Sequence, residues 1–242
     1  MSSSAAKTKT DEREIRDSSP VPAASEDAIW DAYNLLLGGP DVERIRKMLA
    51  RYEFFRRTLE LPGDIVEAGV FKGTCLMYFL KLLEIHSPGS IKRVVGFDLF
   101  EGWAEQAAEE DRSTVQAYLA ESDFTGTTPA AIHAMVARAG FEASKCDLVA
   151  GDITETAKQY VQDNPGFRIS LLNLDLDLGA PTLGALDALW PRVVRGGVVV
   201  FDEYAVAHWS ASQGIDAWIA DRDLQIKTLP WGRSPTAYLV KP

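Results

Sequence analysis

The stretch "LLNLDLDLGAPT", residues 171–182, places two carboxylates inside an apolar run. In a β-strand, side chains two positions apart point to the same face, so Asn173, Asp175 and Asp177 share one face and Leu172, Leu174 and Leu176 share the other. A run this apolar is typical of the middle of a sheet that is covered on both faces. Burying an unpaired carboxylate costs roughly several kcal/mol, a large part of a domain's stability, so the two acids must bind something.

The sequence around this stretch alternates between β-type runs and helical stretches such as residues 76–86 and 182–193, which predicts an α/β fold with a parallel sheet and right-handed crossovers. Two further runs, residues 224–229 and 236–241, are separated by a short "PWGRSP" turn and predict an antiparallel hairpin at one edge. We therefore expect seven strands, mostly parallel, with helices on both faces. The five parallel strands are predicted from "GDIVEAGVF" (63–71), "KRVVGFDLF" (92–100), "CDLVAGDI" (146–153), "RISLLNLDLDL" (168–178) and "GGVVVFDEY" (196–204).

Three segments lie outside this alternation. Residues 1–25 are rich in Ser, Ala and charge and predict a disordered tail before a single domain over residues 26–242. Residues 26–61 predict a helical N-terminal layer, in which Asp41 caps a helix and the apolar "YEFF" segment indicates a homodimer contact. Residues 103–145 predict a helical insertion, whose second helix opens at Thr128-Pro129 and closes at Gly140. We interpret the insertion as a lid over the substrate, with a plain pair of crossover helices as the alternative.

Composition excludes several function classes. Lys and Arg number 25 against 35 Asp and Glu, and the net charge of −10 disfavours binding to nucleic acid or anionic membranes. The two cysteines, Cys75 and Cys146, fall in no CxxC or metal-ligand spacing, which favours a reduced compartment. No apolar run approaches the roughly 18 residues that span a bilayer, and the N-terminus lacks the apolar core of a signal peptide. We expect a cytoplasmic protein that acts on a small molecule.

Acidic residues follow all five parallel strands at or near their carboxyl ends. These ends meet at one edge of a parallel sheet, where open α/β sheets bind their ligands, so we expect the acids to converge there. They are Glu67, Asp98, Asp152, Asp175 with Asp177, and Asp202 with Glu203.

The first strand and turn predict a nucleoside site without a pyrophosphate clamp. Glu67, Gly69 and Gly73 form a spacing that differs from the GxGxxG dinucleotide fingerprint. Asp98 ends the second strand, where a carboxylate accepts from ribose hydroxyls, and Asp152 is placed to accept from an adenine amino group. An acidic first turn suits a cofactor that carries sulfonium and ammonium groups better than it suits NAD.

Four segments resemble the macrocin O-methyltransferase family: "PGDIVEAGVFKG", "VVGFDLFEG", "GDITET" and "ISLLNLDLDLGAPTLGALDALWPRVVRGGVVVFDEY". The resemblance implies a Rossmann-like class I methyltransferase fold. It also implies an S-adenosylmethionine- and Mg²⁺-dependent enzyme that methylates a hydroxyl of a sugar or other intermediate in natural-product and antibiotic biosynthesis. The cofactor-binding residues it implies are Glu67, Gly69, Phe71, Gly73, Thr74, Asp98, Gly102 and Asp152.

The metal ligands that the resemblance implies are Asp175, Asp202 and Glu203, and these carboxylates also suit Mg²⁺ on chemical grounds, because hard cations prefer oxygen ligands. Asp175 and His208 are the candidate general bases. Asp177 is expected to orient a ligand or cap the next helix. Without a cation the acids would repel one another, so replacing Asp202 by alanine is expected to abolish activity yet stabilise the metal-free protein.

The acceptor side departs from the family pattern. Gly179 and Ala180 stand where a "DLYEPT"-type segment has an aromatic residue and a glutamate, and "WSAS" (209–212) stands where a "WPGE"-type segment is common. The acceptor therefore stays open between a sugar, another hydroxylated compound and an amine. One alternative is a catechol-type methyltransferase with an aromatic wall, and the other is a silent adenosine- or metal-binding module. The aromatic wall would come from Trp103, Trp209 and Trp231.

Overall fold

A computed structural model describes residues 25–101, 103, 107–121 and 127–242. Its centre is a sheet of six strands in the order β3-β2-β1-β4-β5-β6, in which the first five are parallel and β6 is antiparallel to β5. This arrangement confirms the predicted α/β class and every predicted parallel strand. The strands are β1 (Asp64–Ala68), β2 (Val94–Asp98), β3 (Cys146–Ala150), β4 (Ile169–Leu174), β5 (Val193–Phe201) and β6 (Ala237–Val240).

The predicted seventh strand is wrong. Residues 224–229 meet β6 only through an isolated antiparallel bridge between Lys227 and Tyr238, whose backbone groups exchange two hydrogen bonds of 2.8 Å. Just before β6, the Thr236 carbonyl oxygen accepts a hydrogen bond of 2.8 Å from the side-chain hydroxyl of Thr228. The Thr236 N–H donates to the carbonyl oxygen of Phe201 in β5. Side-chain and β5 contacts thus replace the ladder bonds that a hairpin needs.

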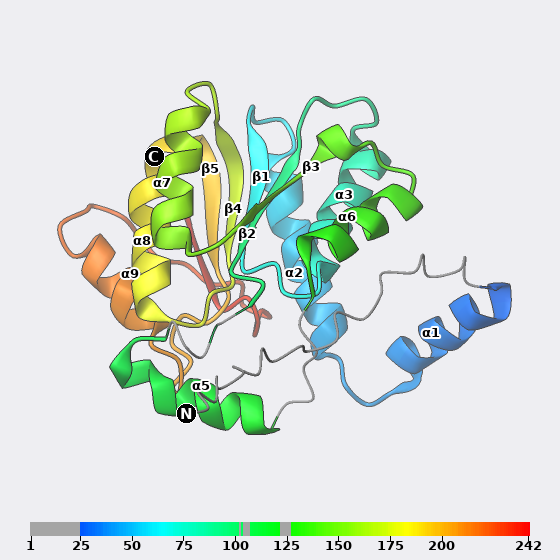
Figure 1. Ribbon diagram of the computed structural model, residues 1–242, viewed down its shortest axis with the longest axis horizontal. Coiled ribbons are helices and arrows are strands. Elements are labelled where there is room, and N and C mark those ends of the chain that lie inside the picture. The colour runs from blue at the N-terminus through cyan, green and yellow to red at the C-terminus, as the bar shows by residue number, and fades with distance from the viewer. Residues whose placement is uncertain (1–24, 102, 104–106, 122–126) are drawn as a thin grey trace, which may run out of the picture.

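Helices cover both faces of the sheet (Figure 1). On one face lie α7 (Ile153–Asp163), α8 (Gly179–Leu189) and α9 (Ala211–Ile219), which pack on Leu172 and Leu174 of β4. On the other lie α2 (Glu43–Thr58), α3 (Thr74–His86) and α6 (Pro129–Arg138), which pack on Leu171 and its neighbours. The alternation predicted for β4 is therefore confirmed. Short 3₁₀ turns at Ala143–Lys145 and Trp190–Arg192 lead into β3 and β5.

Residues 26–61 form the helices α1 (Glu26–Gly38) and α2, but only α2 packs on the sheet, because α1 has no buried residue and lies apart from the sheet in Figure 1. Asp41 accepts a hydrogen bond of 2.7 Å from the Glu43 N–H, which confirms its capping role. Phe54 and Phe55 of the "YEFF" segment are buried under the sheet of their own chain, so this segment is not the dimer face that the sequence indicated. The homodimer stays a prediction, and the predicted tail over residues 1–24 lies outside the described residues.

The insertion between β2 and β3 contains α5 (Glu109–Glu121) and α6, as predicted. Thr128 caps α6 by accepting from the Ala131 N–H at 3.1 Å, and Gly140 follows with a φ of +84°. α6 covers the sheet face, whereas α5 lies across the lower end of the sheet in Figure 1, where the parallel strands end. The position of α5 suits a lid, which remains a prediction.

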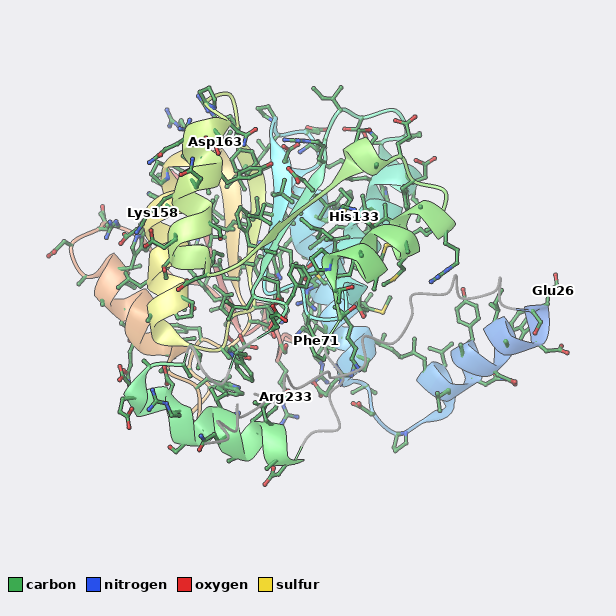
Figure 2. All side chains as sticks on the ribbon, viewed as in Figure 1. Glu26, Phe71, His133, Lys158, Asp163 and Arg233 are labelled. Atoms are coloured by element: carbon green, nitrogen blue, oxygen red, sulfur yellow. The ribbon has the colours of Figure 1, made fainter. Side chains whose placement is uncertain are left out.

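The ligand crevice of this topology lies between β1 and β4, because the chain leaves β1 toward β2 on one side and returns to β4 on the other. Figure 2 shows Phe71, from the loop after β1, at this end of the molecule, and Asp163, the last residue of α7, at the opposite end. Within the ranges given above, no helix is both long and apolar enough to cross a bilayer.

Candidate active site

The loop after β1 approaches the end of β4 too closely for any side chain except hydrogen. A Cβ atom on Gly69 would lie 1.8 Å from the carbonyl oxygen of Asp175, and Gly69 has a φ of +91°. Gly73 takes a left-handed conformation and allows the chain to turn directly into α3. The helix begins at Thr74, so its first N–H groups, which have no partner within the helix, lie at the crevice end of the sheet. This geometry explains why glycine is needed at both positions.

Asp98 organises this loop. Its Oδ2 accepts hydrogen bonds from the N–H groups of Val70 at 2.7 Å and Phe71 at 2.8 Å, and its Oδ1 accepts from Phe100 at 2.7 Å. A carboxylate has about four lone-pair sites, so one remains on Oδ1 for a ligand hydroxyl. The backbone contacts hold Phe71 at a φ of +50°, with its ring exposed at the mouth of the crevice.

Behind the loop lies a buried polar group of unusual composition. Glu67 and Asn173 are neighbours on β1 and β4, and each is only 1% exposed. Within the described chain, Glu67 Oε2, Arg51 Nε and both polar atoms of the Asn173 side chain lack a hydrogen-bond partner. Burial raises the pKa of Glu67 to about 8, against the opposing charge of Arg51. Such atoms cost about 1–3 kcal/mol each when left unpaired, so they point to a polar ligand or ordered water.

The other predicted cofactor residues are placed less directly. Asp152 caps α7 by accepting from the N–H and the hydroxyl of Thr154 at 2.9 Å and 2.8 Å. Its Oδ1 is therefore used by the fold, although the side chain is exposed at the crevice end of β3. Gly102 lies outside the described residues.

Three carboxylates converge at the ends of β4 and β5. One oxygen each from Asp175, Asp177 and Glu203 lies within 4.8 Å of the other two. Two of these residues belong to the predicted metal set, and Asp177 joins them in place of Asp202. The proposed capping role of Asp177 is wrong, because α8 begins after Leu178 with no side-chain cap.

Asp202 instead faces two cations from α2. Lys47 Nζ lies 2.6 Å from Asp202 Oδ2 and 3.1 Å from Asp175 Oδ2, while Arg51 Nη2 lies 2.8 Å from Asp175 Oδ2 and 3.5 Å from Asp202 Oδ1. The Ser234 hydroxyl donates to Asp202 at 2.9 Å. The expectation that the acids repel one another without compensation is therefore wrong for Asp175 and Asp202, which share two cations.

Sequence reasoning missed Lys47 and Arg51. They lie four residues apart on α2, and Arg51 continues into the buried stripe that includes Phe54 and Phe55. The signal that could have found them is the position of two positive charges on the apolar face of a helix. Charges are rarely buried without a partner, so such a position predicts acidic partners elsewhere in the chain.

The proton affinities of the acids follow from this arrangement. Burial raises the pKa of Asp202, but the positive charges of Arg51 and Lys47 lower it by more than burial raises it. The pKa of Asp202 is therefore below its ordinary value. Burial and the Asp175 charge raise the pKa of Asp177 to about 7. Burial, Asp175 and a hydrogen bond with Asp202 raise the pKa of Glu203 well above its ordinary range. The cluster therefore holds protons that a bound cation would release.

An aromatic wall borders the acids. Trp103, Tyr118 of α5 and Trp209 contact one another, with ring centroids 5.3–5.9 Å apart. Burial, together with the charges of Asp177 and Asp175, raises the pKa of Tyr118. The exposed ring of His208 packs on Trp209 at 5.1 Å, so this predicted base belongs to the wall. The described ring contacts of the wall do not include Trp231.

Comparison with known proteins gives the family. The family described as Macrocin-O-methyltransferase (TylF) matches residues 39–227 of the 242. The chain belongs to this family. It is a methyltransferase, and the resemblance seen in the sequence is confirmed.

Three relatives of this macrocin O-methyltransferase family member are informative. The 8-demethyl-8-(2,3-dimethoxy-alpha-L-rhamnosyl)-tetracenomycin-C 4'-O-methyltransferase of Streptomyces olivaceus is 29% identical over 196 residues, which cover 77% of this chain and 73% of that protein. The crystal structure of CalS11, a calicheamicin methyltransferase, is 29% identical with a TM-score of 0.77, covering 91% of this chain and 86% of that one. The O-methyltransferase NovP, 20% identical with a TM-score of 0.68 over 81% of this chain and 80% of that one, shares the fold.

The two departures from the macrocin O-methyltransferase pattern contact each other. The Gly179 N–H donates to the Ser210 hydroxyl at 2.8 Å, and a Cβ on Gly179 would lie 2.9 Å from the Ser210 carbonyl oxygen. On Gly214 of α9, a Cβ would lie 2.2 Å from the Gly179 carbonyl oxygen. The start of α8 thus packs directly against α9, in the space where a large residue at position 179 would stand. The contact between the starts of α8 and α9 also includes the backbone of Asp177, whose carbonyl oxygen accepts a hydrogen bond from the Ala211 N–H at 3.1 Å.

Proposed function

We propose that this protein transfers a methyl group from S-adenosylmethionine to a hydroxyl of a deoxysugar, carried by a natural product or by a nucleotide, with the help of a divalent cation. The observation that carries the proposal is the convergence of three carboxylates, the glycine loop and an aromatic wall at one edge of the sheet. Two relatives support the substrate class, because their names describe methylation of a rhamnosyl group and of TDP-rhamnose.

The residues present fit the cofactor. S-adenosylmethionine supplies the electrophilic methyl group when bound. The open backbone at Gly69, the free N–H groups of α3 and the remaining lone pair of Asp98 match a ligand with a carboxylate and ribose hydroxyls. The unpaired buried atoms of Glu67 and Asn173 match the polar end of the same ligand. We assign Phe71, Gly73, Thr74 and Asp152 to the rim of this site.

The acids also fit Mg²⁺, since the donors are oxygens that lie within 4.8 Å of one another. We propose Asp175, Asp177 and Glu203 as the residues that hold it, while Asp202 is joined to Asp175 through Lys47 and Arg51. Mg²⁺, when bound, would lower the pKa of an acceptor hydroxyl.

The proton of the acceptor hydroxyl must be accepted by a side chain at this edge. Burial and the Asp202 charge raise the pKa of Asp175, but its Oδ2 already accepts from both Lys47 and Arg51, so that oxygen is not open to a substrate proton. Burial raises the pKa of Asp177 to about 7 in the metal-free protein, but a bound cation would lower it, so Asp177 serves in this proposal as a metal ligand and not as the base. His208, whose ring packs on Trp209, stays a candidate for the general base. The flat faces of Trp103 and Trp209 provide a surface for a sugar ring.

Methyl transfer from labelled S-adenosylmethionine tests the proposal directly. The acceptors are a TDP-deoxysugar, a rhamnosylated aglycone, a catechol and an amino sugar, each with Mg²⁺ and with excess chelator. We expect methylation of a sugar hydroxyl that chelator abolishes, while chelator leaves binding of S-adenosylhomocysteine intact. Preference for the catechol would favour the alternative that the aromatic wall suggests. No transfer to any acceptor despite cofactor binding would support a silent module, and full transfer in chelator would end the metal role.

A further inference from the structure

Lys47 and Arg51 contact the same two carboxylates but differ in how they are held. The Arg51 side chain is 8% exposed and packs among the buried residues of α2, whereas the Lys47 side chain is 24% exposed. Lys47 lies one turn nearer the start of α2, at the crevice end of the sheet. Its ammonium is carried by a flexible four-carbon stem, so it can move to solvent, while Arg51 cannot do so without opening the core.

The Lys47 ammonium lies directly between the carboxylates of Asp175 and Asp202, with Nζ–O distances of 3.1 Å and 2.6 Å. Asp175 is also a member of the three-carboxylate group that can hold a cation. A divalent cation at that group would therefore share the Asp175 carboxylate with a positive charge a few ångströms away. Like charges at such a distance repel, most strongly where water is partly excluded.

We propose that Lys47 is a tethered cation that competes with the divalent cation for the acidic cluster and so sets its affinity. Without metal, Lys47 holds Asp175 and Asp202 together. When metal binds, its ammonium leaves Asp175 for solvent, while Arg51 stays. The inference rests on the metal role proposed above, but it concerns metal binding rather than turnover.

Titration of the full-length chain with Mn²⁺, followed by electron paramagnetic resonance of the free ion, tests the competition without any acceptor or cofactor. The variants are Lys47→Met, which keeps the stem length, and Lys47→Gln, which adds polarity in case the first variant folds poorly. The matched control is Lys158→Met, because Lys158 is an exposed lysine on α7 that pairs only weakly with Glu155 at 3.3 Å. Circular dichroism and thermal melts check that each variant is folded.

We expect both Lys47 variants to bind Mn²⁺ at least about tenfold more tightly than the parent, which corresponds to about 1.4 kcal/mol. Lys158→Met should bind like the parent. Both Lys47 variants should also melt at a lower temperature than the parent without metal and gain more from saturating Mg²⁺. Tighter binding by the variants supports the proposal even if the parent itself binds no detectable Mn²⁺.

Two results overturn the proposal, and they are distinguishable. If the parent binds Mn²⁺ and the Lys47 variants bind it equally or more weakly, Lys47 positions the carboxylates instead of competing, and the proposed metal role survives. If neither the parent nor any variant binds Mn²⁺ at millimolar concentration, the metal role of the proposed function fails, and the competition fails with it.

Discussion

Replacing Asp202 by asparagine is expected to destabilise the metal-free protein strongly, because it removes the negative charge between two cations. The Asp202 side chain is 2% exposed. Its Oδ2 accepts from Lys47 at 2.6 Å and from Ser234 at 2.9 Å, and its Oδ1 lies 3.5 Å from Arg51. Asparagine has the same shape but offers one carbonyl oxygen and an NH₂ group that must face a donor.

The magnitude follows from these contacts. Removing one partner of a buried ion pair costs about 3–5 kcal/mol, because the other charge stays buried and unpaired. Asparagine keeps one acceptor, and Lys47 can turn to solvent, so we expect a loss of about 3 kcal/mol at pH 7. This is a large fraction of the roughly 5–15 kcal/mol that stabilises a domain. The sequence alone predicted the opposite sign, since the acids were expected to repel one another.

The pH dependence provides a second check. Burial raises the pKa of Asp202, but Arg51 and Lys47 lower it more, so its folded pKa lies below the unfolded value. A depressed pKa contributes stability that is fully present above the unfolded pKa, about 3.9, and is lost as the pH falls below it. The difference between the parent and the Asp202 variant should therefore be constant from about pH 5 to pH 8.

Urea unfolding in chelator, followed by tryptophan fluorescence, measures the free energy of unfolding of both proteins. The control is Asp187→Asn, which removes a carboxylate that is 56% exposed and 4.0 Å from Arg222. It should change the free energy by no more than about 0.5 kcal/mol. An Asp202 variant as stable as the parent would refute the reasoning and show that repulsion among the acids outweighs the contacts with Lys47 and Arg51.

Three further predictions concern single carboxylates. Asp98→Asn should weaken binding of S-adenosylhomocysteine by about 1.5–3 kcal/mol in calorimetry, since charge-assisted contacts to the loop and ribose are lost; unchanged affinity would place the ribose elsewhere. Burial raises the pKa of Glu67 to about 8, so its contribution to stability is fully present below the unfolded pKa of about 4.3 and is lost as the pH rises through the folded value. Urea unfolding should show the parent losing more stability than Glu67→Gln between about pH 5 and pH 8, and equal slopes would contradict the assignment. Asp177→Asn should lower kcat by about 10²-fold or more in the methyl-transfer assay, because a ligand of the proposed cation is lost. A kcat near that of the parent would remove Asp177 from the proposed metal site.

The sequence by itself determined the sheet and the gathering of acids at one edge. Period-two alternation, as in residues 171–176, depends only on strand geometry, so the side chains of β4 could be assigned to the two faces of the sheet without coordinates. The meeting of Asp175 with Glu203 followed from the rule that parallel strands end at the same edge. The spacing of Gly69 and Gly73 likewise predicted a tight turn before a helix.

Only the tertiary structure decided which charges face each other. Lys47 and Asp175 are separated by 128 positions, and their contact depends on how α2 lies against β4 and β5. The same packing buries Phe54 and Phe55, which look like an interface when the helix is read alone. The repeat of side chains along a helix or strand depends only on local backbone geometry, so it can be predicted from sequence. The partner of a charged side chain depends on the long-range packing that brings two elements together. The sequence therefore predicted where the acids lie, and the packing of α2 determined that they are compensated.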